Sequence, residues 1–277
     1  MPVATPDDVK PTALDFEAAM DAAWPALERQ EAGNWVLRAA GGVTQRANSI
    51  WPRSPEAGQS DADLAAQLSE AKAWYRRRRL LVIFQLFDNP VTSALDDLLD
   101  AERFTRQSET LVMTLSAPVA GAPESPGEAA SSELAVELAP MPSGEWLRVW
   151  WEVDGRGGED ALATARTILE GCPSVYALAR DSGGRAAAVG RLAIPAGSTL
   201  GGVYGMATRP DARRNGYAAA ILQALLQAGR HRGVTDYWLL VTAANHGAQE
   251  LYAKAGFLET GRYLYRQERP RRAPTGC

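Results

Sequence analysis

A short segment in the last third of the chain has the residue types of an anion-binding loop. Arg213, Gly216 and Ala218 follow a strand-like run and a Pro-Asp turn, and an apolar helical run begins directly after them. The first N–H groups of a helix lack partners within the helix and lie at the positive end of its dipole. Glycine lets a ligand approach the backbone, and arginine adds positive charge. The spacing therefore predicts a site for a phosphate-like group.

A second segment combines an amide and a phenol at helical spacing. Asn245 follows an apolar strand-like run, Tyr252 lies two turns into the next predicted helix, and Gly256-Phe257 ends that helix. Each residue also has a simpler structural interpretation. Asn245 suits a helix N-cap, Gly256 suits a left-handed helix end, and a helical tyrosine commonly packs in a core.

Together the two segments resemble the two signatures of the GCN5-related N-acetyltransferases. Arg213, Gly216 and Ala218 occupy the specified positions of the pattern Gln or Arg, two residues, Gly, one residue, Gly or Ala. In the second signature an Asn precedes a helix that carries a Tyr seven residues later, as Asn245 and Tyr252 do. The remaining matches, in order and spacing, are Ala248, Leu251, Gly256 and Phe257. The resemblance covers roughly residues 200 to 257.

This resemblance implies an acetyl-CoA site between strands expected at 203–207 and 237–242. Asn245 would bond the pantetheine arm, and Tyr252 would protonate the leaving thiolate as general acid. A phenol near pKa 10 is a slightly weaker acid than a thiol near 8.5, which costs about 2 kcal/mol. The pantetheine amides would pair with the main chain of Met206, Ala207 and Thr208. The pyrophosphate would be held by Arg213, Arg214, Asn215, Gly216, Tyr217 and Ala218.

The general base and the acceptor are less well defined by the sequence. Family members often carry an acid about four residues ahead of the Thr208 position, where this chain has Tyr204. We therefore expect a base that acts through water. Trp146 and Trp150 are one helical turn apart and suit a core, whereas Trp151 lies on another face. Trp151 and Tyr204 are our candidates for contacts with the acceptor, a small-molecule amine or a peptide N-terminus.

Two alternatives remain open at this point. The chain could be a CoA-binding sensor or scaffold without turnover. The missing strand acid argues for this alternative, and the presence of Tyr252 argues against it. It could also be a tandem acetyltransferase that resembles mycothiol synthase, which pairs two such domains.

Composition excludes several function classes. The 277 residues are 46% hydrophobic and carry a net charge of −4, which indicates neither nucleic-acid nor anionic-membrane binding. No run approaches the roughly 18 apolar residues of a membrane span, and the N-terminus lacks the pattern of a signal peptide. The two cysteines and two histidines are too few for a disulfide framework or a zinc cluster. We expect a cytoplasmic protein that binds no metal.

The segment 117–132 is rich in Pro, Gly, Ala and Ser, which is typical of a linker between domains. It separates a domain at 1–116 from a catalytic domain at 133–277. Both halves predict the same order of strand, helix, strand, helix and strand. In the first half these are 47–51, 61–78, 80–87, 93–103 and 109–115; in the second they are 203–207, 218–232, 237–242, 248–255 and 263–266. Ahead of this second set we expect strands at 133–138, 175–180 and 186–194 and helices at 144–153 and 159–170.

Aligning Phe104 with Phe257 places Leu99 where the second half has Tyr252, and Arg103 where it has Gly256. Residues 52–59 also lack the anion-loop pattern. The basic run at 76–79 ends a predicted helix, where cations complement the dipole. The expected fold is α/β with mixed sheets: two tandem acetyltransferase-like domains, each a splayed sheet flanked by helices, of which the first is degenerate.

Overall fold

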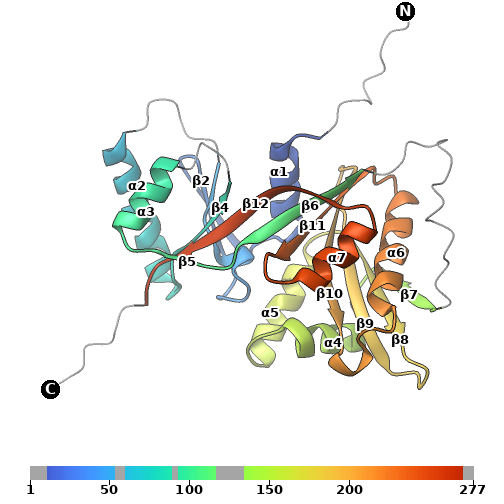
Figure 1. Cartoon of the computed structure of the whole chain (residues 1–277). Coiled ribbons are helices and arrows are strands. Elements are labelled where there is room, and N and C mark those ends of the chain that lie inside the picture. The colour runs from blue at the N-terminus through green and yellow to red at the C-terminus, as the bar shows by residue number, and fades with distance from the viewer. Residues whose placement is uncertain (1–10, 54–59, 89–92, 117–133, 271–277) are drawn as a thin grey trace, which may run out of the picture. The chain divides into compact units, whose positions relative to one another are not determined.

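A computed structural model describes residues 11–53, 60–88, 93–116 and 134–270, and Figure 1 shows the order of their elements. The helices are α1 (Ala13–Ala23), α2 (Asp61–Arg77), α3 (Ser93–Ala101), α4 (Gly144–Asp154), α5 (Glu159–Glu170), α6 (Tyr217–Arg230) and α7 (His246–Lys254), with short 3-10 turns η1 (Arg46–Asn48) and η3 (Pro210–Ala212). The strands are β1 (Glu28–Ala32), β2 (Trp35–Ala39), β3 (Trp51–Pro52), β4 (Ile83–Phe87), β5 (Thr105–Arg106), β6 (Thr110–Ser116), β7 (Val136–Ala139), β8 (Ser174–Arg180), β9 (Ala186–Ala193), β10 (Leu200–Thr208), β11 (Asp236–Thr242) and β12 (Leu258–Gln267).

The described chain divides into two compact units, and each draws on both halves of the sequence. The first unit takes its residues from Met1–Ala23, Thr114–Asp154 and Glu170–Leu239. The second takes them from Trp24–Met113, Gly155–Leu169 and Leu240–Cys277. The chain passes from one unit to the other inside strands β6 and β11. The predicted linker at 117–132 lies outside the described residues, and the boundaries at 116 and 133 stay a prediction.

The first unit is built on a mixed sheet with the order β11-β10-β9-β8-β7. Strands β10 and β11 are parallel, and the other neighbours are antiparallel. Helices α4 and α6 both pack on this sheet. Every residue of β9 is buried, and its side chains are small or apolar except for that of Arg191.

The second unit contains a small antiparallel sheet, β1-β2-β3, and the strands β4, β12, β6 and the end of β11 in that order. Its core holds the buried faces of β2, β4, α2 and α3. The core residues with less than 2% exposure include Trp35, Leu37, Ile50, Tyr75, Phe84 and Leu99. Strand β1 is a charged, exposed edge, which disfavours pairing with other chains.

The strand that closes each half of the sequence lies against the other half. Strand β12 pairs antiparallel with β4, from Tyr263 opposite Phe87 to Gln267 opposite Ile83 (Figure 1). Strand β6 lies between β12 and β11. The backbone N–H of Ala243, just after β11, donates to the carbonyl of Glu109, just before β6. The second half therefore completes its sheet with a strand from the first half.

The α/β class with a mixed sheet is confirmed, and most predicted elements are observed within a few residues. The helices expected at 61–78, 144–153, 159–170 and 218–232 correspond to α2, α4, α5 and α6. The hairpin between β8 and β9 closes through a bond from the Gly184 N–H to the Asp181 carbonyl. The basic run also ends a helix, and Arg78 stacks on Trp74 and pairs with Glu28.

The strand expected at 47–51 is wrong for most of its length. Residues 46–48 form the turn η1, and β3 contains only Trp51 and Pro52. The side chain of Asn48 explains the turn. Its Oδ1 accepts from the N–H groups of Ala40 and Gly42, and its Nδ2 donates to the carbonyls of Val43 and Thr44. These four bonds fix a compact loop where hydrophobic alternation indicated an extended chain.

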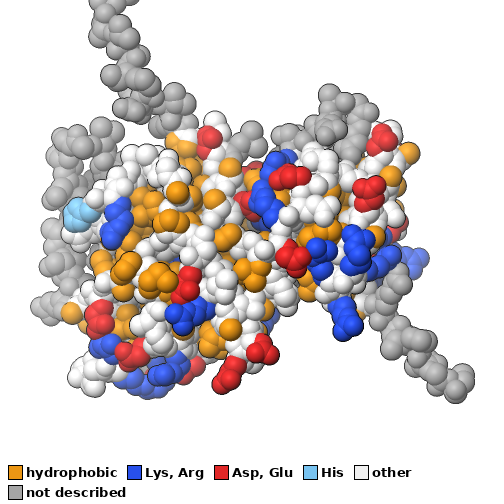
Figure 2. Space-filling view, turned by 180° about the vertical axis from the view of Figure 1, so that it is seen from behind, with side chains coloured by type: hydrophobic (Ala, Val, Ile, Leu, Met, Phe, Trp, Pro, Cys, Tyr) orange, Lys and Arg blue, Asp and Glu red, His pale blue; other side chains and the backbone are white. Residues whose placement is uncertain are grey.

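Charges of both signs are interspersed on the face in Figure 2, in keeping with the small net charge. Among the described residues, no helix combines the length and apolarity needed to cross a bilayer. In the same ranges, no group of three or more His, Cys, Asp or Glu side chains lies close enough together to hold a metal ion.

Candidate functional site

The strand that was predicted to bind a ligand through its backbone is interrupted by a bulge. Strand β10 pairs with β9 at Tyr204 opposite Arg191, and next at Ala207 opposite Val189. Three steps along β10 thus oppose two along β9, and the ladder is disrupted at the extra residue. On its other side, β10 pairs with β11 over Leu200–Val203. The described pairing of β10 with β11 ends at Val203, three residues before Met206.

Two glycines and a tryptophan shape this bulge. Gly205 has a φ of 59°, and a Cβ there would lie 3.1 Å from the ring of Trp146. The indole N–H of Trp146 donates to the carbonyl of Gly190 on β9 at 3.1 Å. A Cβ at Gly190 would lie 2.6 Å from the sulfur of Met206. The sequence analysis did not identify these supports, although glycine inside a strand is a signal of a bulge or a close approach.

In the predicted anion loop the N–H of Arg213 donates to the Pro210 carbonyl at 3.5 Å, and the residues after it carry the remaining backbone donors. Arg214 and Gly216 both have left-handed backbones, with φ of 67° and 81°. Left-handed residues that alternate with other conformations turn successive N–H groups toward one point and form an anion-binding nest. Gly216 is the N-cap of α6, and no side chain caps this helix. Among the described residues, the loop and the first turn of α6 therefore present N–H groups that no side chain caps.

Charged side chains surround this loop. Arg213, Arg214 and Asn215 are exposed, and Arg213 Nε lies 3.4 Å from the carbonyl oxygen of Thr208. Asp211 forms ion pairs with Arg185 and Arg209. After the loop, Tyr217 is buried and Ala218 is half-buried on α6, which anchors the helix start in the first unit.

Asn245 occupies the N-cap of α7, as its simpler structural interpretation predicted. Its Oδ1 accepts from the N–H of Ala248 at 3.2 Å, and its own N–H donates to the carbonyl of Thr242. Asn245 is exposed. Within the described ranges its Nδ2 makes no hydrogen bond, so both amide hydrogens remain free to bind a ligand.

Tyr252 lies seven residues further along the same helix and is 7% exposed. Its ring meets Phe257 edge to face at 6.2 Å. Burial raises the pKa of its phenol to about 12. Among the described residues, no group bonds its hydroxyl, which therefore stays protonated and can donate to a ligand.

The two aromatic candidates for the acceptor differ in exposure. Tyr204 is 5% exposed, and its hydroxyl accepts a hydrogen bond from the indole N–H of Trp238 at 3.0 Å. Trp151 is half-buried, with its ring 5.6 Å from that of Trp150. Trp146 and Trp150 are buried, which confirms that they belong to the core.

The predicted residues fall into two groups. Tyr204, the backbone of Met206–Thr208 and the loop Arg213–Ala218 belong to the first unit, as does Trp151. Asn245 and Tyr252 belong to the second unit, where α7 carries both.

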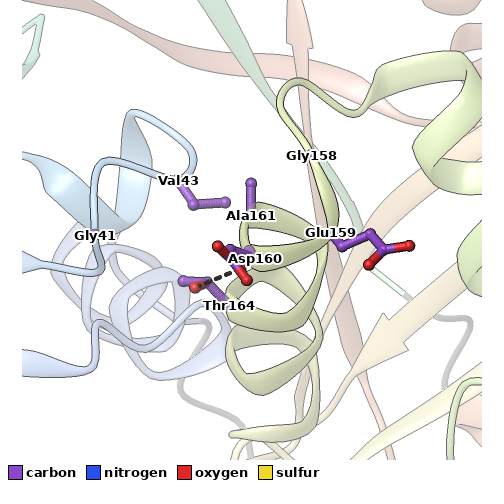
Figure 3. A pocket seen from close by; sticks show the side chains of 7 residues that line it. All are labelled: Gly41, Val43, Gly158, Glu159, Asp160, Ala161 and Thr164. Atoms are coloured by element: carbon purple, nitrogen blue, oxygen red, sulfur yellow. Dashed lines mark hydrogen bonds between the residues drawn. The ribbon is translucent and has the colours of Figure 1, made fainter.

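A pocket of about 570 Å³ lies elsewhere in the second unit (Figure 3). It is lined by the loop at Gly41 and Val43 and by the start of α5, including Glu159, Asp160 and Thr164. The Thr164 hydroxyl donates to the Asp160 carbonyl within the helix. None of the predicted site residues lines this pocket. Its two acids lie in the first turn of α5, where they favourably meet the helix dipole.

Known proteins match nearly the whole chain and not only the two motif segments. The profile of the family described as "Probable histone acetyltransferase Rv0428c C-terminal" matches residues 13–266. A Bacillus subtilis (strain 168) protein described as "Uncharacterized N-acetyltransferase YobR" is 26% identical over 265 residues, which cover 95% of this chain and 100% of that protein.

Two solved structures share the fold over nearly the whole chain. A GCN5-related N-acetyltransferase from Kribbella flavida has a TM-score of 0.65 at 17% identity, covering 94% of each chain. A tandem GNAT protein from the clavulanic acid biosynthesis pathway has a TM-score of 0.62 at 14% identity, covering 93% of this chain and 89% of its own. At these identities the likeness shows the fold.

Proposed function

Since the chain belongs to the family "Probable histone acetyltransferase Rv0428c C-terminal", within the GNAT superfamily of acetyltransferases, we propose that it transfers an acetyl group from acetyl-CoA to an amine. The open anion nest at the start of α6 is the observation that carries the choice of donor. A pyrophosphate needs several convergent N–H groups, and this loop supplies them without a competing side-chain cap.

The proposed donor site uses the backbone more than side chains. The N–H groups from Arg213 to Ala218 hold the pyrophosphate, aided by the guanidinium groups of Arg213 and Arg214. Hydrogen bonds to a charged group contribute about 1.5–3 kcal/mol each. The main chain of Met206, Ala207 and Thr208 pairs with the pantetheine amides like an added strand, beyond the point where β10 leaves β11. The free amide hydrogens of Asn245 bind the pantetheine arm.

In the proposed reaction the acceptor nitrogen attacks the thioester carbonyl. A C–N bond forms, the C–S bond breaks, the amine loses a proton, and the CoA thiolate gains one. A backbone N–H at the β10 bulge stabilises the oxyanion of the tetrahedral intermediate. Tyr252 supplies the proton to the thiolate. Its raised pKa of about 12 makes full transfer costlier by about 3 kcal/mol than for a phenol in water, so we expect a strong hydrogen bond to precede transfer.

The acceptor amine also has to lose a proton, at a cost of about 4.6 kcal/mol at pH 7 for an amine with the pKa of lysine. The acid that many family members carry on this strand is replaced by Tyr204, whose hydroxyl bonds Trp238. Glu152 on α4 is engaged with Arg209. We therefore propose a base that acts through an ordered water.

Two aromatic residues are proposed to contact the acceptor, a small-molecule amine or a peptide N-terminus. Trp151 is half-buried and offers a surface that attracts a cationic amine through its ring. Tyr204 lies on the strand that carries the bulge. The setting proposed for this reaction is the cytoplasm.

Acetyl-CoA turnover against a panel of amines, polyamines, amino acids, amino sugars and peptides tests this function. We expect turnover with at least one acceptor.

Tyr252→Phe should lower kcat by about 10²- to 10⁴-fold, the usual contribution of a general acid, while CoA affinity changes little. Because burial raises the pKa of Tyr252 to about 12, its hydroxyl stays protonated below pH 10. The rate should therefore rise with pH as the amine deprotonates, and it should not fall again below pH 10. Tight CoA binding without any acceptor would instead support a CoA-binding sensor.

A further inference from the structure

Two side-chain amides tie down the backbone of the two proposed donor-binding segments in the same manner. Asn215 Nδ2 donates to the carbonyls of Ala212 and Arg213, at 3.3 and 3.2 Å. Gln249 Nε2 donates to the carbonyls of Thr242 and Ala243, at 3.1 and 2.9 Å. Each amide therefore bridges two consecutive carbonyl groups just ahead of residues proposed to bind the donor.

Holding a carbonyl also sets the direction of the next N–H. The peptide unit is planar and trans, so its C=O and N–H point in opposite directions. When Asn215 draws the Arg213 carbonyl inward, the N–H of Arg214 is turned outward, to the side an anion would approach. The same bonds keep two partially negative oxygens away from that anion.

The conformation of Arg214 shows that the loop needs such support. A left-handed backbone costs a residue other than glycine about 1–2 kcal/mol, and Arg214 adopts it with φ of 67°. Strained conformations persist where the surroundings fix them. The Asn215 amide, one residue away, bonds both carbonyls that precede the strained residue.

Gln249 acts on the second segment from inside α7. Its side chain reaches back over the helix start to the end of β11, where Thr242 also accepts from the N–H of Asn245. The turn that presents the Asn245 side chain is thereby held at two consecutive carbonyls. Asn245 Oδ1 is already bonded to Ala248, so only its amide hydrogens face outward.

We infer that Asn215 and Gln249 are positioning residues of the donor site: Asn215 aligns the N–H groups for the pyrophosphate, and Gln249 aligns Asn245 for the pantetheine arm. This inference rests on the proposed function. It gives each amide a different part of the donor, which an experiment can separate.

The test compares acetyl-CoA with S-acetylpantetheine, a donor that lacks the pyrophosphate. Asn215→Ala and Gln249→Ala are compared with Gln223→Ala, an exposed amide on α6 that bonds neither segment. We expect the ratio of kcat/KM for acetyl-CoA to kcat/KM for S-acetylpantetheine to fall about tenfold in Asn215→Ala. In Gln249→Ala, kcat/KM should fall about tenfold for both donors, so the ratio stays within twofold. Calorimetry of CoA binding should show weaker affinity in both variants, with thermal midpoints close to that of Gln223→Ala.

The outcomes are distinguishable. A wild-type chain that uses no donor and binds no CoA overturns the proposed function together with this inference. A wild-type chain that uses acetyl-CoA, with Asn215→Ala and Gln249→Ala both matching Gln223→Ala, overturns this inference alone. An equal loss with both donors in Asn215→Ala would show a general structural role and would also overturn the assignment to the pyrophosphate.

Discussion

Helices α2 and α6 occupy the same place in the order of helices predicted for the two halves of the sequence, but their N-termini are capped differently. At α2, the Ser60 side chain accepts from the N–H of Asp63, and the Asp63 carboxylate accepts from the N–H and hydroxyl of Ser60. These bonds lower the pKa of Asp63. At α6, Gly216 offers no side chain and the first turn is uncapped. At α2 a carboxylate of the chain itself therefore occupies the helix N-terminus, whereas at α6 we propose that the donor pyrophosphate does so.

The next helices keep a common backbone and differ in chemistry. The N–H of Phe104 donates to the Leu99 carbonyl at 2.9 Å, as that of Phe257 does to the Tyr252 carbonyl at 3.0 Å. Arg103 has a φ of 60° where Gly256 has 93°. The predicted alignment of the halves is thus supported by equivalent helix ends. Leu99 is fully buried in the core, in the place where α7 carries the candidate acid.

Helix α3 binds a buried arginine of the last described strand. Arg266 on β12 is fully buried and forms ion pairs with Asp96 and Asp100 of α3, and it donates to the Phe104 carbonyl. These contacts hold the last strand of the chain against the first half. In the first half, α3 thus holds the strand that follows α7, whereas for α7 itself we propose a role in the chemistry.

The largest effect should come from removing the acids that hold Arg266. The double variant Asp96→Asn, Asp100→Asn leaves a buried guanidinium without a counter-ion, which costs about 3–5 kcal/mol of unfolding free energy. Urea unfolding measures this. Asp97→Asn, an exposed acid on the same helix, is the matched control and should change stability by less than about 0.5 kcal/mol. Equal stability of the two variants would contradict the structural role of α3.

A smaller effect is expected at the paired helix ends. Arg103→Gly relieves a left-handed arginine and should stabilise the fold by about 1 kcal/mol, whereas Gly256→Ala should destabilise it by about 1–2 kcal/mol. Thermal unfolding of both variants measures the difference. The same sign of change in both would show that the two helix ends are not equivalent.

Sequence reasoning succeeded where the signal was local. The pattern from Arg213 to Ala218 located a loop and a helix start, and the spacing from Asn245 to Tyr252 located a capped helix. Pairing of β12 with β4 was beyond its reach, because alternation in Tyr263 and Tyr265 fits any neighbouring strand. The strand predicted at 47–51 was wrong because four hydrogen bonds of the Asn48 side chain fix a turn in a β-like run. The bulge supports at Trp146 and Gly190 depend on contacts between distant elements.

Calorimetric titration of CoA into the wild-type chain and into Gly216→Asp tests most directly that only the second half binds the donor. Gly216→Asp places a carboxylate at the start of α6, as Asp63 does at α2. We predict one CoA per wild-type chain and loss of binding in Gly216→Asp, whose stability should fall only by the roughly 1–2 kcal/mol that a left-handed residue other than glycine costs. Two CoA molecules per chain, or one bound with unchanged affinity in Gly216→Asp, would contradict the account.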